Sequence, residues 1–558
     1  MNQIVKFVKI QQSYVPSDPL VFPETLFMDA REEEGAVPVM AYAGKNFLPT
    51  YYGYKSFFGI NDLMEPPPLT DESVHQIFVF QNSIKENYYI ALTASGVLAY
   101  KAGSGELQWN LVIDTSAYPS GCFWTYCLLQ NEIYIYRKGL PYIIKVASSG
   151  APGGYALSAA YYAGNPAGLF LTEETPTFLS MGAQVGIFTA GNRLGIWDNT
   201  NSVAWSSIDN PMDFTPSLST LAGSAKFAKV QGDIVNILPH GEDFVIYATK
   251  SVVHVRHAPS TPMLWAAIRI LTDTGITYPE EVVKGVPDST HFAWTHSGMY
   301  KVTNGNVEQA IPEVTDYLRT YASPRYLKLM DGRYLVFEIV DSSIAQNSKP
   351  FEQIEGIAMA YAMKQGSPLS SGAFSEVTQA PSNLSSSLGG GIPHDCYSTR
   401  YGAYVFDTRL EKWGKLDQTY KVLVDYRAIN NFQTTLRSQT VDGPYSGILN
   451  AAGELRVFTD TPQISYMVYG KVGYYRQGTT SVEEIRIHHR KAKAGWVAMQ
   501  TSMEGKVPES QYTTTETFDS SGFWIKYGDI AGRWHNIIIG GQYDINYVEF
   551  RGITQGKR

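Results

Sequence analysis

The sequence predicts an all-β protein: a β-propeller with an N-terminal extended arm and a C-terminal β-sandwich-like module. Aromatic residues make up 13% of the 558-residue chain, with 38 Tyr, 25 Phe and 10 Trp. Such residues fit the pleated, half-buried surface of a sheet. Short alternating segments separated by Gly, Asn and Ser turns run through most of the chain, whereas helical periodicity is weak.

The propeller prediction depends on how these short segments are grouped. Four strands are expected at His75–Phe80, Tyr88–Thr93, Gly96–Tyr100 and Leu107–Val112, which is the spacing of one four-stranded antiparallel blade. Similar clusters recur at irregular intervals, as expected for decayed repeats with insertions. They are Glu132–Val146, Val185–Trp205, Ile234–Arg256, His291–Val302, Tyr326–Val340 and Ala403–Leu416.

Three regions are predicted. Residues 1–70 are rich in Pro and aromatic residues with little alternation, which favours an extended N-terminal arm. Residues 71–460 form the propeller, interrupted near 366–391 by a Ser/Gly-rich loop with too little apolar surface to order itself. Residues 461–558 form the β-sandwich-like module. Its expected strands are Ser481–His488, Trp496–Ser502, Phe523–Tyr527, His535–Ile539 and Asn546–Arg551, and short helices are expected at Glu313–Tyr321 and Ile354–Lys364.

Charge and cysteine content argue against several classes of protein. A net charge of −8 argues against a phosphate-binding surface. The clearest basic cluster, His488-His489-Arg490-Lys491, is interpreted as a strand end. Cys122, Cys127 and Cys396 are too few for a disulfide framework or a four-thiolate zinc site, so buried free thiols are expected. With no signal peptide or membrane span predicted, synthesis in the cytoplasm is expected.

The histidines are the first candidates for catalytic or metal-binding residues. His254 and His257 are three residues apart on a predicted strand, a spacing that favours opposite faces over shared metal binding. His291 and His296 flank Trp294 in the same way, and His394-Asp395-Cys396 is too compact for a His–Cys couple. We therefore predict no catalytic, cofactor-binding or metal-binding residues, no cofactor and no enzymatic activity. Paired carboxylates for glycoside hydrolysis remain open, because the chain has 52 Asp and Glu.

Several hairpins resemble one family. Val185–Asp198, followed by Val203–Phe214 with its Asn-Pro-Met-Asp-Phe turn, is similar to the tail hub or nozzle proteins of short-tailed bacteriophages (tail tubular or DNA-stabilisation-like proteins). Further segments resemble later blades of that family. They are Gly241–Val255, Gly275–Tyr278, His291–Val302 and Tyr404–Gly414, with weaker similarity at Met503–Gly505 and Ile530–Arg533.

The resemblance implies a virion structural protein of the viral tail. Such subunits assemble as a ring-shaped homo-oligomer, a homohexamer, that continues the DNA channel below the head–tail adaptor protein and supports tail fibres or spikes. Viral DNA passes through the lumen during ejection without sequence-specific binding, and negative charge would let it slide. The alternative is a phage-tail propeller that binds or hydrolyses glycans, which requires clustered acids or a metal at the propeller axis.

Overall fold

The computed structural model describes most of the chain. The described residues are 3–4, 8–16, 37–62, 66–70, 73–82, 85–118, 123–147, 169–177, 183–259, 264–285, 289–322, 327–340, 399–428, 431–435, 445–472, 479–502, 512–518, 523–526, 531–532 and 534–555. The predicted loop at 366–391, the predicted helix at Ile354–Lys364, Cys122 and the sequence His394-Asp395-Cys396 lie outside these residues.

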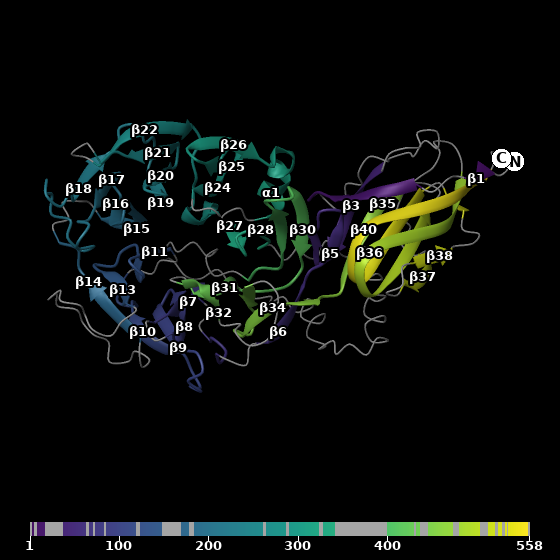
Figure 1. Ribbon diagram of the computed structural model, residues 1–558, viewed down its shortest axis with the longest axis horizontal. Helices are drawn as coiled ribbons and strands as arrows, with labels where there is room; N and C mark the ends of the chain where they lie inside the picture. Colours follow the sequence, from purple (N-terminus) through teal and green to yellow (C-terminus); the bar gives the residue numbers. More distant parts are fainter. Residues whose placement is uncertain are drawn as a thin grey trace, which may run out of the picture.

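Seven four-stranded antiparallel sheets surround a common axis and form a β-propeller within the described part of the chain (Figure 1). In the first six blades the first strand along the chain lies nearest the axis (Figure 1). The first three blades are β7 (Val74–Gln81), β8 (Asn87–Thr93), β9 (Gly96–Lys101) and β10 (Asn110–Asp114); β11 (Trp124–Leu129), β12 (Glu132–Arg137), β13 (Ile143–Ala147) and β14 (Phe170–Glu174); and β15 (Gln184–Ala190), β16 (Arg193–Asp198), β17 (Ser202–Trp205) and β18 (Gly223–Lys226).

The next three blades follow the same pattern. They are β19 (Ile234–His240), β20 (Asp243–Ala248), β21 (Val252–His257) and β22 (Trp265–Thr272); β23 (Val282–Lys284), β24 (Thr290–Thr295), β25 (Gly298–Thr303) and β26 (Asn306–Ala310); and β27 (Leu327–Met330), β28 (Tyr334–Glu338), β29 (Ala403–Asp407) and β30 (Lys412–Leu416). The short helices η1 (Pro279–Glu281), η2 (Pro312–Val314) and α1 (Thr315–Tyr321) lie in loops before β23 and β27. Thus the helix expected at Glu313–Tyr321 is present.

The seventh blade is closed by a strand from the other end of the chain. It contains β31 (Val422–Ala428), β33 (Ser446–Leu449) and β34 (Leu455–Pro462), with β32 (Asn431–Thr435) hydrogen-bonded at the end of β31. Its outermost strand is β6 (Phe58–Asp62), which pairs antiparallel with β34. β31 also pairs in parallel with β7 of the first blade, so the last blade is bonded to the first.

The C-terminal module is built on two very long strands, β36 (Thr479–Ser502) and β40 (Trp534–Gln555). They pair antiparallel along almost their full length, with register shifts between His488 and Ala494 where β-bulges let the hairpin bend. β35 (Ser465–Val472) pairs with the first half of β40 and β2 (Val8–Tyr14) with the second half, so the hairpin contributes to two layers. The remaining strands are β1 (Gln3–Ile4), β3 (Val37–Lys45), β37 (Tyr512–Phe518), β38 (Phe523–Lys526) and β39 (Ala531–Gly532).

The prediction of an extended arm over residues 1–70 is wrong for the strands that the structure describes. β1, β2 and β3 pair within the sandwich module, while β6 completes a propeller blade. The Pro-rich and aromatic pattern misled the prediction because each of these strands also pairs with a strand more than 350 positions away. The predicted strands Ser481–His488 and Trp496–Ser502 are parts of the single strand β36. Likewise, His535–Ile539 and Asn546–Arg551 are parts of the single strand β40. Bulges interrupt the pairing of these two long strands.

The two modules share one hydrogen-bonded sheet and one hydrophobic core. β4 (Phe47–Pro49) pairs with β30 of the sixth blade and with β5 (Tyr54–Ser56), and β5 pairs with β40 of the sandwich. One cluster of buried side chains extends from Trp294 and Phe337 in the propeller through Phe47 to Ile485 and Ile539 in the sandwich. Since independent domains usually meet through smaller, more polar interfaces, this junction is built like a domain interior.

Candidate functional site

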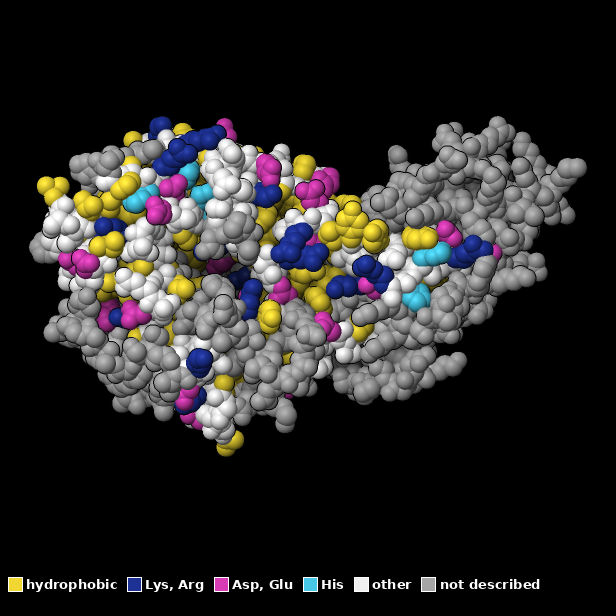
Figure 2. All heavy atoms as spheres, viewed as in Figure 1, with side chains coloured by type: hydrophobic (Ala, Val, Ile, Leu, Met, Phe, Trp, Pro, Cys, Tyr) yellow, Lys and Arg dark blue, Asp and Glu magenta, His cyan; other side chains and the backbone are white. Residues whose placement is uncertain are grey.

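The axis of the propeller is lined by alternate residues of the innermost strands. On β31, Leu423, Asp425 and Arg427 are partly exposed, whereas the intervening Val424 and Tyr426 are buried within the blade. This alternation follows from the two-residue period of a strand. In Figure 2, acidic and basic side chains lie in the recess at the middle of the ring. The axis therefore presents polar and charged groups, while each blade keeps its apolar residues for packing.

At one end of the axis a side-chain hydrogen bond connects blades that are not neighbours. His75 Nε2, on the first blade, lies 3.1 Å from Oε1 of Glu280, which precedes β23 of the fifth blade. Burial lowers the pKa of His75 despite the opposing effect of Glu280. The contact is therefore a hydrogen bond between a neutral imidazole and a carboxylate at neutral pH. It spans the axis at the starts of the inner strands.

A buried ion pair adjoins this contact. The Arg400 guanidinium donates from Nε to Oε2 of Glu338 at 2.9 Å, and the two side chains are only 7% and 1% exposed. Lys328 of β27 interacts electrostatically with Glu338, Glu280 and Arg400, and burial lowers its pKa. We name His75, Glu280, Lys328, Glu338 and Arg400 the axial cluster. Its two carboxylates are matched by two cations, so the charges compensate one another.

Beyond the axial cluster, the axis presents partly exposed aromatic side chains. Tyr126 of β11 and Tyr445, just before β33, are 38% and 44% exposed. The Asp331 carboxylate accepts hydrogen bonds from the Tyr445 backbone N–H and the Ser446 hydroxyl, both at 2.9 Å. Burial raises the pKa of Asp331, and the charge of Asp425 adds to this effect.

Arg427 limits the acid–base chemistry that is open to Asp331 and Asp425. Its Nε donates to Asp425 Oδ1 at 2.9 Å, which keeps Asp425 engaged in an ion pair. An acid with a raised pKa beside an ionised acid is the pattern of a general acid with a partner carboxylate. Here the partner is already bound by a guanidinium. Sequence reasoning missed these residues because they come from separate blades and share no spacing.

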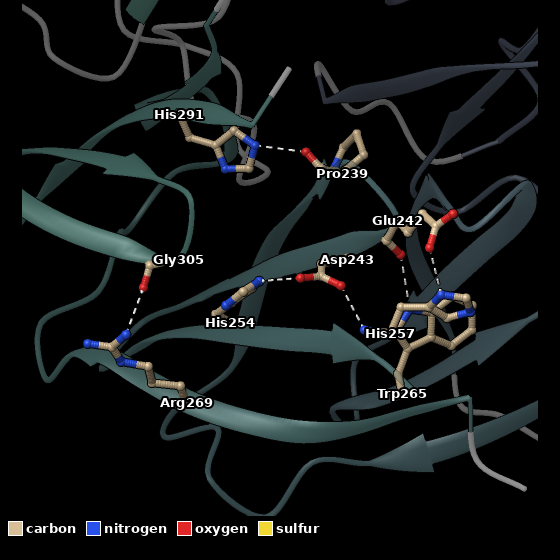
Figure 3. A network of polar contacts seen from close by, with 9 residues as sticks. All are labelled: Pro239, Glu242, Asp243, His254, His257, Trp265, Arg269, His291 and Gly305. Atoms are coloured by element: carbon tan, nitrogen blue, oxygen red, sulfur yellow. Dashed lines mark hydrogen bonds and ion pairs between the residues drawn. The ribbon is translucent and has the colours of Figure 1, made fainter. Parts of the chain in front are cut away.

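A cluster of histidines lies between the fourth and fifth blades (Figure 3). The rings of His254 and His291 are centred 5.2 and 5.3 Å from the ring of His240. His254 Nε2 lies 2.9 Å from Asp243 Oδ2, and His291 lies 2.8 Å from the Pro239 carbonyl oxygen and 2.9 Å from the Tyr247 hydroxyl. All three histidines are at most 6% exposed.

Burial keeps this cluster neutral. It lowers the pKa values of His240 and His254, and it lowers the pKa of His291 to about 3. Both ring nitrogens of His240 are buried without a hydrogen-bond partner. Among the described residues, no three His, Cys, Asp or Glu side chains are placed to hold a metal ion. The three imidazoles thus pack against one another between the fourth and fifth blades as neutral rings.

The histidines that the sequence singled out are separated as their spacing suggested. The His254 and His257 rings bind different carboxylates, Asp243 and Glu242, although the His257 backbone N–H also donates to Asp243 (Figure 3). His291 is buried, whereas His296 is exposed and contacts the Thr249 carbonyl oxygen. The clustering of His240, His254 and His291 carried no sequence signal, because it arises only when two blades pack together.

Acid is expected to destabilise the protein through His291. The pKa of His291 is about 3 in the folded chain and 6.5 in the unfolded chain. Below pH 6.5 the unfolded chain therefore binds a proton that the folded chain does not bind. The stabilisation is complete above pH 6.5 and is lost as pH falls from 6.5 towards 3. At pH 5 the loss from this residue is about 2 kcal/mol.

The measurement is chemical denaturation of wild type and His291→Gln between pH 5 and 7. The wild-type unfolding free energy should fall by about 2 kcal/mol more than that of the variant over this range. His296→Gln, which changes an exposed histidine, is the matched control and should keep the wild-type slope. Equal slopes for wild type and His291→Gln would contradict the prediction.

Comparison with known proteins gives no family. No family model and no curated protein matches the chain. Among solved structures, YCF48 from Cyanidioschyzon merolae is 11% identical, with 72% of this chain and 98% of that chain covered and a TM-score of 0.35. Virginiamycin B lyase from Staphylococcus aureus is 12% identical, covering 50% and 96%, with a TM-score of 0.27. Exo-β-1,3-galactanase from Phanerochaete chrysosporium is 10% identical, covering 89% and 100%, with a TM-score of 0.23.

The chain is an all-β protein with a β-propeller fold, as its own sheets establish. Cys127 is a buried free thiol, and burial raises its pKa. In the described residues, no helix is long and apolar enough to cross a bilayer.

Proposed function

We propose that this chain is a virion structural protein: one subunit of a ring-shaped homo-oligomer, a hexamer, that forms the tail hub or nozzle of a short-tailed bacteriophage. In this role it continues the DNA channel below the head–tail adaptor protein and supports tail fibres or spikes. The proposal rests on the sequence resemblance, whose principal segments fall in the hairpins β15–β16, β20–β21, β24–β25 and β29–β30 of four successive blades.

The observation that carries the proposal is the continuous sheet joining propeller and sandwich. A subunit that connects an adaptor to tail fibres has to hold its two modules in a fixed relative orientation. Backbone pairing from β30 through β4 and β5 to β40 provides that rigidity, because bending the junction would break hydrogen bonds and expose the shared core.

The axial cluster supports a channel between subunits rather than through each propeller. His75 and Glu280 meet across the propeller axis, and Arg400 and Glu338 fill the adjoining space with paired charges. DNA would therefore pass through the centre of the ring of subunits. Each copy contributes a net charge of −8, which favours sliding over phosphate binding.

The experiment is light scattering and electron microscopy of the purified protein. Closed rings with six times the 62.0 kDa subunit mass are expected. A single 62.0 kDa species at high concentration would contradict the proposal. If that single species also released sugars from a glycan, it would favour the alternative function, to which Asp331 and the exposed Tyr126 and Tyr445 give some support.

A further inference from the structure

An ordered loop on the outside of the third blade exposes apolar side chains. This loop, residues 206–222 between β17 and β18, is named the rim loop; its Leu218 and Ile208 are 84% and 43% exposed. The third blade lies at the end of the molecule opposite the sandwich (Figure 1). Isolated apolar side chains on a surface need no explanation. Whether these two form a binding surface therefore depends on the contacts that fix the backbone of the rim loop.

The rim loop is fixed at both ends by buried polar side chains. Arg193 Nη1 donates to the carbonyl oxygens of Ser206 at 2.7 Å and Thr220 at 2.8 Å. The Trp205 indole N–H donates to the Leu221 carbonyl oxygen at 2.8 Å. In the middle of the loop Met212 and Phe214 are inserted into the core. Leu218 is thus presented on a preorganised backbone, which lowers the entropic cost of binding a partner.

The charge of the rim loop is entirely acidic. It contains Asp209 and Asp213 and no Lys or Arg. A β-bridge between Asp213 and Thr177 connects the loop to the second blade. Hydrogen bonds from Thr215 lower the pKa of Asp213, which favours its charged form. A partner surface for this loop should combine apolar or aromatic groups with cations.

Such a surface exists at the junction between propeller and sandwich. The turn between β4 and β5 exposes Tyr51 by 72% and Tyr52 by 57%, with the two rings edge to face at 4.8 Å. Lys412 Nζ donates to the Tyr51 carbonyl oxygen at 3.1 Å, and the Arg490 guanidinium lies 5.8 Å from the centre of the Tyr52 ring. We name these four residues the junction patch. Figure 2 shows hydrophobic and basic side chains together over this part of the molecule.

We infer that copies of this chain join head to tail, with the rim loop of one copy docked on the junction patch of the next. Acidic and aliphatic groups on the rim loop complement the basic and aromatic groups of the junction patch. Tyr and Arg are also the side chains that most often dominate binding at protein interfaces. The two surfaces differ and lie on different sides of the subunit, so the contact is heterologous and generates a ring when its rotation closes.

This inference rests on the proposed ring and identifies the surfaces that form it. Its test uses two surface variants of the full chain, Leu218→Lys and Arg490→Glu, each of which places like charges in the contact. Each variant alone should lose the ring and remain at 62.0 kDa by light scattering. Leu107→Lys is the control, because Leu107 is 92% exposed on the first blade, and this variant should assemble like the wild type.

Mixing the two variants gives the sharpest result. The rim loop of Arg490→Glu and the junction patch of Leu218→Lys are both intact, so at least one contact can form. The mixture should therefore contain two-subunit or larger species that neither variant forms alone. Wild-type rings that persist in both variants would overturn the inference while leaving the proposed function standing. A mixture that stays at the single-subunit mass would also overturn it. A wild type that forms no rings would instead contradict the proposed function itself.

Discussion

Replacing Arg400 with methionine is expected to lower the free energy of unfolding by about 3–5 kcal/mol. The variant leaves Glu338, whose side chain is 1% exposed, as a buried carboxylate without its guanidinium partner. Lys328 lies close enough to interact with Glu338, but burial already lowers the pKa of that lysine. Because the axial cluster also connects the first and fifth blades through His75 and Glu280, the loss should destabilise the whole ring of blades. Denaturant unfolding monitored by tryptophan fluorescence would measure it.

Two further variants separate a charge effect from a packing effect. Combining Arg400→Met with Glu338→Leu removes both charges, and the double variant should recover most of the stability that the single variant loses. Glu308→Gln is the matched control, since the Lys301–Glu308 pair is 37% and 65% exposed and should change stability by less than about 1 kcal/mol. A single variant as stable as this control would disprove a structural role for the Arg400–Glu338 pair.

Replacing Gly59 with valine is expected to open the seventh blade. A Cβ atom at this position would lie 1.9 Å from the Thr461 carbonyl oxygen, so β6 cannot keep its pairing with β34. Overpacking a buried site costs about 1–3 kcal/mol or more, and here the obstacle is backbone that cannot rotate away. We expect a loss of about 3 kcal/mol in unfolding free energy, together with faster amide exchange across Leu455–Pro462.

The neighbouring position provides the control for this prediction. Asn61 is an exposed residue on the same strand and pairs with Val457, so Asn61→Ala should leave both stability and amide exchange close to wild type. If Gly59→Val kept wild-type amide protection in β34, the closing role of β6 would be refuted.

The blades were largely predictable because their strands pair with neighbours in sequence. The prediction for Tyr88–Thr93 agrees with β8 at Asn87–Thr93, and that for Gly96–Tyr100 with β9 at Gly96–Lys101. Leu107–Val112 was placed too early: β10 begins at Asn110, and Leu107 is almost fully exposed. In each case alternation and turn residues, both local signals, carried the information.

The elements that join distant parts of the chain were not predictable in this way. The strand β4 has only three residues, and its pairing with β30 places Phe47 opposite Lys415. The axial and histidine clusters were missed for the same physical reason, since each is assembled from several blades. The basic residues around Arg490 suggested a strand end, but bulges let β36 continue past them with a change of direction.

The interleaving of the two chain ends imposes an order on biosynthesis. The hydroxyl groups of Ser56 and Ser465 lie 2.7 Å apart although 409 residues separate them in the sequence. At about 5–20 residues per second, a ribosome needs roughly 20–80 s to make the second after the first. Throughout that interval β6 has no partner strand, and the edge of β5 that pairs with β40 is open. Unpaired strand edges of this kind readily join those of other nascent chains. Premature termination upstream of β34 would therefore yield aggregation-prone fragments, because this polypeptide can complete its fold only after β34 and β40 have been synthesised.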